Sequence, residues 1–228
     1  MTAWYTAIAI AMASCTPTPS APSAPRQLSR VPYESLCVTK GSLFPRGDAV
    51  VVADPTVRAF VAGTYGDAAE VAFVFRGNAR VMRPLGSGEV RRQLGLKLRA
   101  ANSCNVVYVM WRLDPEPFVE VSVKHNPGAR THEDCGTRGY TKVPPSGAAG
   151  VPMLAPGSSH VLRAEIRGDD LFAWIDRDLV WSGALPHAAR SLAGPVGFRS
   201  DNVELELTSL AAAPGGDATC RRSRGDDF

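Results

Sequence analysis

The sequence predicts an all-β fold, a two-sheet antiparallel β-sandwich with little helix. Apolar and polar residues alternate with period two along most of the chain, which is the pattern of half-buried strands. Eighteen prolines and 21 glycines in 228 residues favour frequent turns over long helices. Between residues 29 and 213 the only helical expectation is a short turn near Pro186 to Ser191.

The expected strands are β-rich runs bounded by Gly, Pro, Asn or Asp. In chain order they are Glu70 to Phe75, Glu89 to Arg99, Asn105 to Leu113, Phe118 to His125, Val161 to Arg167, Leu171 to Asp176, Leu179 to Trp181 and Val203 to Leu210. A tight turn at Gly168-Asp169-Asp170 is expected to join two of them. Short strands at this spacing are typical of a sandwich or barrel.

The N-terminus begins with an apolar segment that ends at Cys15. Met12-Ala13-Ser14-Cys15 resembles the lipobox of bacterial lipoproteins, in which the signal peptide is cut before a cysteine that then carries lipid. The segment is too short to span a membrane, which takes about 20 apolar residues, and it lacks the Lys or Arg of an ordinary secretory signal. The resemblance implies a lipid anchor at Cys15 and a location in the cell envelope, facing outside the cytoplasm. Simple secretion and a cytosolic protein are the alternatives.

The chain divides into four predicted segments: a signal peptide over 1–14, a lipidated cysteine with a Pro/Ser-rich tether over 15–29, a β-domain over 30–213, and a charged tail over 214–228. About 200 residues after the tether suit a single β-sandwich. The net charge of +3, with both signs interspersed, favours neither nucleic acid nor a membrane-binding patch. We therefore expect a monomer that contacts the membrane through its lipid anchor only.

Four further cysteines form an even set without a C-x-x-C pair, which in an oxidising compartment predicts two disulfides. Of the three possible pairings we expect Cys104 with Cys135, which flank one hairpin, and Cys37 with Cys220, which would join the two ends of the domain. A zinc site using Cys135 and histidines is the rival interpretation. Metal-ligand spacing is absent, so neither a metal nor another cofactor is expected.

The last third of the domain carries a fold resemblance. It reads as two strands over residues 160–176, a short element at Leu179 to Trp181, the turn Gly194-Pro195-Val196-Gly197-Phe198, and a closing strand from Val203. This succession resembles the concanavalin A-like jelly roll, especially laminin-G-like and 3-keto-disaccharide hydrolase-type domains. The resemblance covers residues 155–212 and extends to the rest by strand count. It implies a jelly-roll fold, which hosts lectins, glycosidases and adhesion modules alike.

Catalytic residues stay unassigned. Family-sixteen-type glucanases of this fold place their carboxylates as E-x-D-x-x-E on one strand, and no such string occurs here. The nearest pairs, Glu204 with Glu206 and Asp176 with Asp178, share a strand face. A retaining glycosidase instead needs two carboxylates about 5 Å apart across the scissile bond. Solvated strand faces produce such pairs routinely.

Three consecutive strands supply the best candidate surface. Alternation places Val90, Leu94, Leu96 and Leu98 on one face, and likewise Val119, Val121 and Val123. If the strands lie side by side, the opposite face is basic with an aromatic in it, and it carries Arg91, Gln93, Lys97, Arg99, Tyr108, Arg112, Glu120 and Lys124. Arginine forks suit carboxylate or sulfate, and an aromatic ring suits a pyranose. The alternative is an ordinary solvated sheet face.

Residues 126–159 form the longest stretch without a strand pattern, and such loops are usually functional or disordered. A bridge from Cys104 to Cys135 would hold this stretch as an ordered flap beside the groove. The side chains expected within reach of a ligand are His125, Asn126, His132, Glu133, Arg138 and Tyr140. Trp111, Trp174 and Trp181 are expected in the core or in strand pairs.

These observations predict a surface lipoprotein whose domain binds an extracellular glycan, a polysaccharide or glycoconjugate, without turning it over. The predicted ligand-binding residues are Arg91, Lys97, Arg99, Tyr108, Arg112, Glu120, Lys124, His125, Arg138 and Tyr140. Salt should weaken binding, and Arg112→Ala should weaken it at nearly unchanged stability if Arg112 is exposed. The alternatives are a carbohydrate-active enzyme, a glycoside hydrolase or lyase, and a structural envelope protein.

Overall fold

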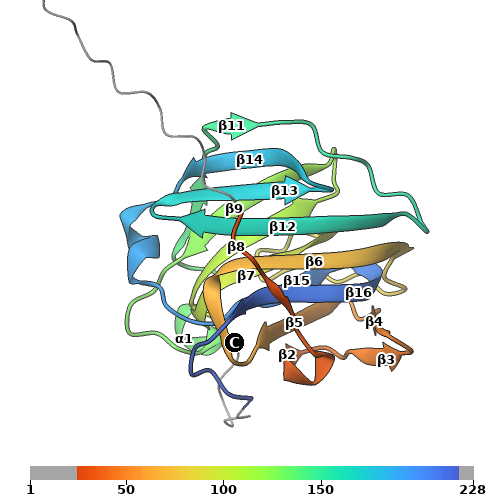
Figure 1. Cartoon of the computed structure of the whole chain (residues 1–228), viewed down its shortest axis with the longest axis horizontal. Helices are drawn as coiled ribbons and strands as arrows, with labels where there is room; N and C mark the ends of the chain where they lie inside the picture. The colour runs from red at the N-terminus through yellow and green to blue at the C-terminus, as the bar shows by residue number, and fades with distance from the viewer. Residues whose placement is uncertain (1–24, 221–228) are drawn as a thin grey trace, which may run out of the picture.

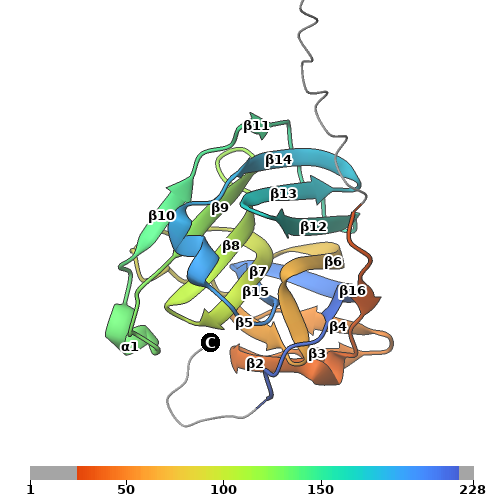
Figure 2. The same ribbon diagram turned by 60° about the vertical axis from the view of Figure 1, so that its left-hand side comes forward.

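A computed structural model describes residues 25–220, and it shows two antiparallel sheets packed face to face (Figures 1 and 2). The nine-stranded sheet has the order β11 (Gly147–Ala148), β14 (Asp178–Ala184), β13 (Asp170–Ile175), β12 (Ser159–Arg167), β6 (Thr64–Asn78), β16 (Val203–Pro214), β4 (Ala49–Val52), β3 (Phe44–Arg46), with β1 (Ser29–Arg30) paired to β16. The seven-stranded sheet has the order β10 (Tyr140–Val143), β9 (Phe118–Lys124), β8 (Asn105–Arg112), β7 (Gln93–Asn102), β15 (Gly197–Asp201), β5 (Thr56–Val61), β2 (Leu36–Lys40).

Helix is confined to three short pieces among the described residues: η1 (Tyr33–Ser35), α1 (His132–Cys135) and η2 (His187–Ser191). None of the helices in that part of the chain has the length and apolar character of a membrane span. The predicted signal peptide, the lipidated Cys15, most of the tether and the end of the tail lie outside the described residues. The prediction of an all-β sandwich with little helix is confirmed.

The hydrophobic core lies between the two sheets and follows from the alternation of side chains. Leu94, Leu96 and Leu98 of β7 are fully buried there, as predicted from period two. Trp111 of β8 is also fully buried and meets the ring of Phe73 edge to face, with centroids 5.9 Å apart. Each such apolar side chain stabilises the fold by about 1.5–3 kcal/mol through burial.

Each expected run contains a strand, and β7, β8 and β9 lie side by side as the candidate surface requires. The strand expected from Glu89 begins only at Gln93, however, and Val90, which was expected on the core face, is 50% exposed because it lies before the paired segment. The structure adds strands that were not expected, namely β1 to β5 before residue 62, β10 and β11 in the flap, and β15. Gly197 to Asp201 was expected as a turn, but it forms β15 between β5 and β7. Phe198 and Ser200 face the interior while Arg199 and Asp201 face the other way, so alternation was present in this short run.

Both predicted disulfides are confirmed. Cys37 of β2 is bonded to Cys220, with 5.3 Å between their Cα atoms, and this ties the predicted tail to the seven-stranded sheet. Cys104 in the β7–β8 turn is bonded to Cys135 at the end of α1, with 5.8 Å between their Cα atoms. The zinc interpretation is wrong, because a disulfide sulfur is not available as a thiolate ligand.

The flap is more regular than its sequence suggested. Thr131 and Asp134 form a capping box at the start of α1, and β10 then pairs with β9 with Tyr140 opposite Lys124. The middle of the flap therefore extends the seven-stranded sheet by one strand. The expectation of a stretch without strands over residues 126–159 is wrong, because backbone pairing with β9 supplied the order that side-chain patterning did not reveal.

Candidate functional site

A cavity of about 360 Å³ lies on the outward face of the seven-stranded sheet. Residues from all seven strands form its floor and walls. Outside the strands it is lined by Pro84 to Ser87, Arg91, Ser103, His132, Gly136 and Thr137. The sheet residues that line it include Thr56, Arg58, Gln93, Tyr108, Met110, Glu120, Ser122, Lys124, Tyr140, Lys142 and Arg199. Its size is at the lower end of the range of about 300–1,000 Å³ for small-molecule sites.

Cross-strand register brings these side chains together from distant parts of the sequence. Lys97 of β7 lies between Tyr108 on β8 and Gly197 on β15. In the next row Arg199 lies between Gly95 and Arg58. A Cβ atom at Gly95 would lie 2.1 Å from the carbonyl oxygen of Val109, so the close approach of β7 and β8 under the cavity requires glycine there.

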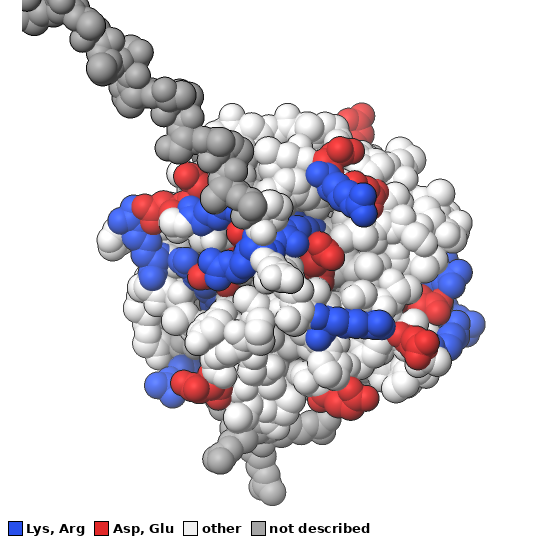
Figure 3. Space-filling model, viewed as in Figure 1, with Lys and Arg blue, Asp and Glu red and all other residues white. Residues whose placement is uncertain are grey.

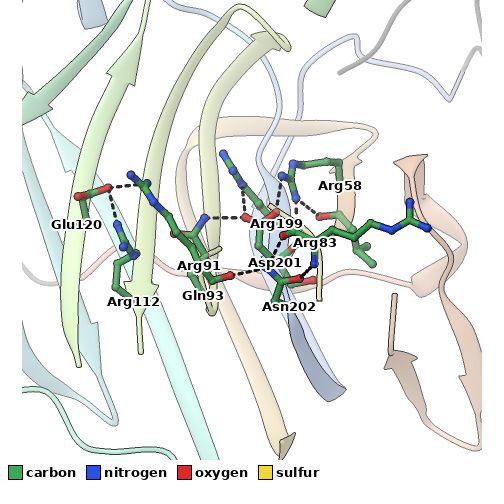
Figure 4. A network of polar contacts seen from close by, with 11 residues as sticks. Arg58, Arg83, Arg91, Gln93, Arg112, Glu120, Arg199, Asp201 and Asn202 are labelled. Carbon is green, nitrogen blue, oxygen red and sulfur yellow. Dashed lines mark hydrogen bonds and ion pairs between the residues drawn. The ribbon is translucent and has the colours of Figure 1, made fainter. Parts of the chain in front are cut away.

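Asp201 is the hub of the polar network at one end of the cavity (Figure 4). This fully buried carboxylate accepts hydrogen bonds from Arg58 Nη2 at 2.7 Å, Arg199 Nε at 2.9 Å and Gln93 Nε2 at 2.6 Å. Burial alone would raise the pKa of Asp201, but the charges of Arg199 and Arg58 outweigh it and hold the pKa below its usual value. Asp201 therefore stays ionised and fixes the two guanidinium groups.

Two tyrosine rings stack on each other, and a cationic side chain lies close to each ring. The rings of Tyr108 and Tyr140 have centroids 6.1 Å apart and an interplanar angle of 23°. The guanidinium of Arg199 lies 4.9 Å from the Tyr108 centroid, and Lys124 Nζ lies 5.2 Å from the Tyr140 centroid. Burial, with the neighbouring Tyr140, raises the pKa of Tyr108 to about 12, so its hydroxyl stays protonated.

Lys124 also holds the rim of the cavity. Its Nζ donates to the carbonyl oxygens of Ser103 at 3.1 Å and Gly136 at 2.8 Å. Burial, with the charge of Arg199, lowers the pKa of Lys124 to about 8. The ammonium thus links β9 to both loops that the disulfide from Cys104 to Cys135 joins.

At the opposite end several cations converge on Glu120. Lys142 Nζ lies 2.8 Å from one of its oxygens, and Arg112 and Arg91 lie 3.5 and 3.6 Å from the other. Both arginines also pair with Glu89, whose pKa is lowered mainly by its hydrogen bond to Arg91. Figure 4 shows the guanidinium groups of Arg91 and Arg112 turned toward the carboxylate of Glu120. This end of the cavity is close to balanced in charge.

The structure places the ten predicted ligand-binding residues in three different settings. Five of them line the cavity, namely Arg91, Tyr108, Glu120, Lys124 and Tyr140. Lys97 and Arg112 lie on the same face of the sheet but are buried beneath it, at 1% and 7% exposure. The expectation that Arg112 is exposed is therefore wrong, because its guanidinium packs 5.5 Å from the Phe118 ring and pairs with both glutamates.

Arg99, His125 and Arg138 lie outside this group. Arg99 has a φ of 47°, and the register of β7 and β8 shifts between Leu98 and Asn102, so alternation breaks at this residue. Its side chain turns to Asp67 of β6 in the other sheet, with Nε 2.6 Å from Oδ1. His125 Nε2 lies 3.3 Å from Ser191 Oγ. Arg138 folds back onto α1 and donates to the carbonyl oxygens of residues 134 and 135.

The sequence interpretation missed Arg58, Lys142, Arg199 and Asp201. Each belongs to a strand that was not expected, on β5, β10 or β15. Alternation in Phe198-Arg199-Ser200-Asp201 could have indicated the strand β15. An apolar residue and a small residue, Phe198 and Ser200, alternate there with the charged Arg199 and Asp201. The pairing of β15 with both β5 and β7 had no local signal, because it joins segments far apart in the chain.

The carboxylate pairs considered for catalysis lie away from the cavity. Glu206 pairs with Arg76 on the outward face of the nine-stranded sheet, where acidic and basic side chains lie next to one another (Figure 3). Asp176 and Asp178 flank the β13–β14 turn. Among the described residues that line the cavity, Glu120 is the single carboxylate, and three cations hold it.

In a second polar cluster a serine, a histidine and an aspartate are hydrogen-bonded in series, as in a Ser-His-Asp catalytic triad. Ser158 Oγ lies 3.0 Å from His160 Nε2, and His160 Nδ1 lies 2.7 Å from Asp176 Oδ2. The amide groups beside the serine are already used, since Gly157 and Ser158 donate to the carbonyl oxygens of residues 75 and 155. With those donors occupied they do not form an oxyanion hole. Asp176 Oδ1 also accepts from the Val161 amide, so the cluster joins the start of β12 to the turn between β13 and β14.

No group of three or more His, Cys, Asp or Glu side chains in residues 25–220 is arranged to hold a metal ion. The chain matches no protein-family model and no curated protein. Solved structures do match in fold. The carbohydrate binding module CBM66 from Bacillus subtilis is 11% identical with a TM-score of 0.55, covering 78% of this chain and 96% of the module.

Two further solved structures have lower scores. The metal-free carbohydrate recognition domain of Emp46p is 13% identical with a TM-score of 0.48, covering 81% of this chain and 90% of that domain. The second is the kappa-carrageenase from Pseudoalteromonas carrageenovora in complex with an oligotetrasaccharide of kappa-carrageenan. It is 6% identical with a TM-score of 0.47, and the match covers 85% of this chain and 98% of the carrageenase chain. At such identities the likeness concerns the fold. The chain has the concanavalin A-like jelly-roll fold, as the resemblance in its last third implied.

Proposed function

We propose that this protein binds an extracellular glycan, or a glycan-bearing partner, in the cavity of the seven-stranded sheet without turning it over. The stacked tyrosines in the wall of that cavity carry the proposal. Tyr140 is 43% exposed at the rim, and its ring offers a flat apolar surface to a sugar ring. The cavity lining also provides polar groups that suit sugar hydroxyls, from Arg91, Gln93 and Ser122.

The fold likeness gives this proposal its context. The solved structure with a TM-score of 0.55 is a carbohydrate binding module, and it shares the two-sheet architecture with this chain. Proteins of one fold can have different functions. The main support for glycan binding is therefore the set of residues in the cavity, and the fold likeness is additional support.

The arrangement of carboxylates supports binding over hydrolysis. A two-carboxylate glycosidase needs an acid and a nucleophile or base on either side of the bond. The cavity offers Glu120, and Asp201 is buried below it with three hydrogen bonds. The charges of Arg199 and Arg58 lower the pKa of Asp201, whereas a general acid needs a raised pKa.

Anchoring at the cell envelope belongs to the same proposal. The lipobox-like Met12 to Cys15 and the Pro/Ser-rich tether would hold the domain outside the cytoplasm. A disulfide-bonded domain suits that compartment, because structural disulfides persist where the environment is oxidising.

The test is a glycan array probed with the full chain, followed by titration of the best ligand against Tyr140→Ala. Loss of one stacking ring should weaken binding at least tenfold, because aromatic packing supplies part of the affinity. Tyr65→Ala is the matched control, since Tyr65 is an exposed tyrosine on β6 outside the cavity. Equal loss in both variants, no binding to any glycan, or cleavage of the bound glycan would each contradict the proposal.

A further inference from the structure

The two ends of the cavity differ in charge balance. At the Glu120 end, three cations face two carboxylates, Glu120 and Glu89. At the other end the cations outnumber the carboxylates more strongly, since Asp201 is the one carboxylate there among the described residues. We call this end the cationic end, and its cations are Arg58, Lys97, Lys124 and Arg199.

Arg199 offers unused donors at this end. Its Nε bonds to Asp201, and its side chain is 11% exposed and lines the cavity. Its two terminal amino groups make no hydrogen bond to the described residues. Arg58, by contrast, directs its terminal amino groups to two carbonyl oxygens and to Asp201. Arg199 therefore presents a guanidinium edge, fixed by Asp201, of the kind that binds carboxylate or sulfate through two parallel hydrogen bonds.

Lys97 is a second unmatched cation. Its side chain is fully buried on the cavity side of β7, and its Nζ has no hydrogen-bond partner within residues 25–220. Burial, with the charges of Arg58 and Arg199, lowers the pKa of Lys97 to about 7. Native proteins pair buried ammonium groups, since an unpaired one is costly. Arg199 already pairs with Asp201, so an anion bound at Arg199 would supply the negative charge that Lys97 lacks.

We propose that the cationic end binds the acidic group of a charged glycan, a carboxylate or a sulfate ester, with Arg199 as its hydrogen-bond donor and Lys97 as a charge beneath it. This inference rests on the proposed function and specifies its ligand class. The sugar ring that carries the acidic group would pack against Tyr140, whose ring stacks on the Tyr108 ring under Arg199. Arg199 and the tyrosine pair are adjacent, so one acidic sugar unit can satisfy both.

The test is calorimetric titration of the full chain with three probes at about 150 mM salt: a trigalacturonate, its methyl ester, and a sulfated galactotriose. The methyl ester removes the charge and keeps the ring. We expect the acid to bind at least tenfold more tightly than its ester, and the sulfated probe to show whether sulfate replaces carboxylate. Preference for either anionic probe over the ester supports the proposal, and equal binding of all three overturns it.

Two variants assign the preference to the cationic end. Arg199→Gln should abolish most of the preference for the acid over the ester. Lys97→Met should reduce it severalfold. Lys97 Nζ has no hydrogen-bond partner within residues 25–220, so this substitution breaks no hydrogen bond there. Arg76→Ala, on the outward face of the other sheet, is the control for net charge. If the preference survives both cavity variants, or falls equally in the control, the assignment is wrong.

The same experiments separate the two proposals. Binding of the ester as tightly as the acid, with loss in Tyr140→Ala, overturns the anion site and leaves glycan binding intact. Absence of binding for every probe, together with an empty glycan array, overturns both proposals.

Discussion

The guanidinium of Arg199 lies 4.9 Å from the centre of the Tyr108 ring, although the two residues come from strands that are distant in sequence. β7 lies between their strands, and Gly95 occupies the position opposite Arg199. Because glycine has no side chain, the guanidinium can extend across β7 to the tyrosine. This contact joins the Asp201 network to the stacked tyrosines, and it makes the floor of the cavity a single connected unit.

Asp201→Asn should destabilise the domain by about 3–5 kcal/mol, because it leaves Arg58 and Arg199 buried without their shared carboxylate. Since the folded pKa of Asp201 is lowered, its contribution is present above the ordinary carboxyl pKa and is lost as pH falls through the folded value. Chemical unfolding of both proteins at pH 7 and pH 3 measures this. A loss of stability that is equally large at both pH values would contradict it.

Lys97→Met should raise stability, and more at pH 6 than at pH 9. The folded pKa of Lys97 is about 7, and its ordinary value is 10.5. Between these values the unfolded chain binds more protons, so the stability of the native protein rises with pH, by about 1.4 kcal/mol for each pKa unit. Thermal unfolding of both proteins at the two pH values gives the difference. A gain that does not depend on pH would show that Lys97 does not titrate in this range.

Removing the Cys104 to Cys135 bridge should lower stability by about 3–4 kcal/mol, the loop-entropy value for a separation of 31 residues. The double variant Cys104→Ala/Cys135→Ala should also weaken glycan binding, because the bridge holds the loops that Lys124 joins. Unfolding and binding are measured on the same preparation. Cys37→Ala/Cys220→Ala serves as the comparison, and it should lower stability while leaving more of the binding.

Arg112→Ala should lower stability measurably, by about 1–3 kcal/mol, because the side chain is buried and pairs with Glu120 and Glu89. This reverses the expectation from sequence, which assumed an exposed residue. Lys142→Ala is the informative comparison, since Lys142 pairs with the same Glu120 but is 72% exposed. Its effect should stay within about 0.5 kcal/mol. Similar losses in the two variants would mean that burial is not the deciding factor.

Cys15→Ser should release the protein from the membrane fraction or block its processing, if the lipobox-like segment is processed as the resemblance implies. Mass spectrometry of the mature N-terminus gives the direct measurement, with an acyl mass expected on Cys15. Ser14→Ala, which keeps the cysteine, is the control. A mature N-terminus elsewhere, without an acyl mass, would contradict anchoring.

Local sequence patterns were enough to predict part of the structure. Period two in residues 93–98 and 119–123 determined which side chains enter the core, because successive side chains of a strand point to opposite faces whatever the partner strand is. The even number of cysteines and their positions in the sequence were likewise enough to predict both disulfides. The order of strands and turns over residues 155–212 was enough to predict the jelly-roll fold.

The site depended on information that is not local. Strand pairing brought Arg58 and Arg199 beside Lys97, and the backbone hydrogen bonds that join β5, β15 and β7 carry no signature in side-chain type. Alternation failed at Arg99, where a left-handed backbone turns the side chain toward Asp67 of the other sheet. Burial was also decided by tertiary structure. Alternation gives the face on which Lys97 and Arg112 lie, whereas the depth of each side chain depends on the neighbours that long-range pairing places over it.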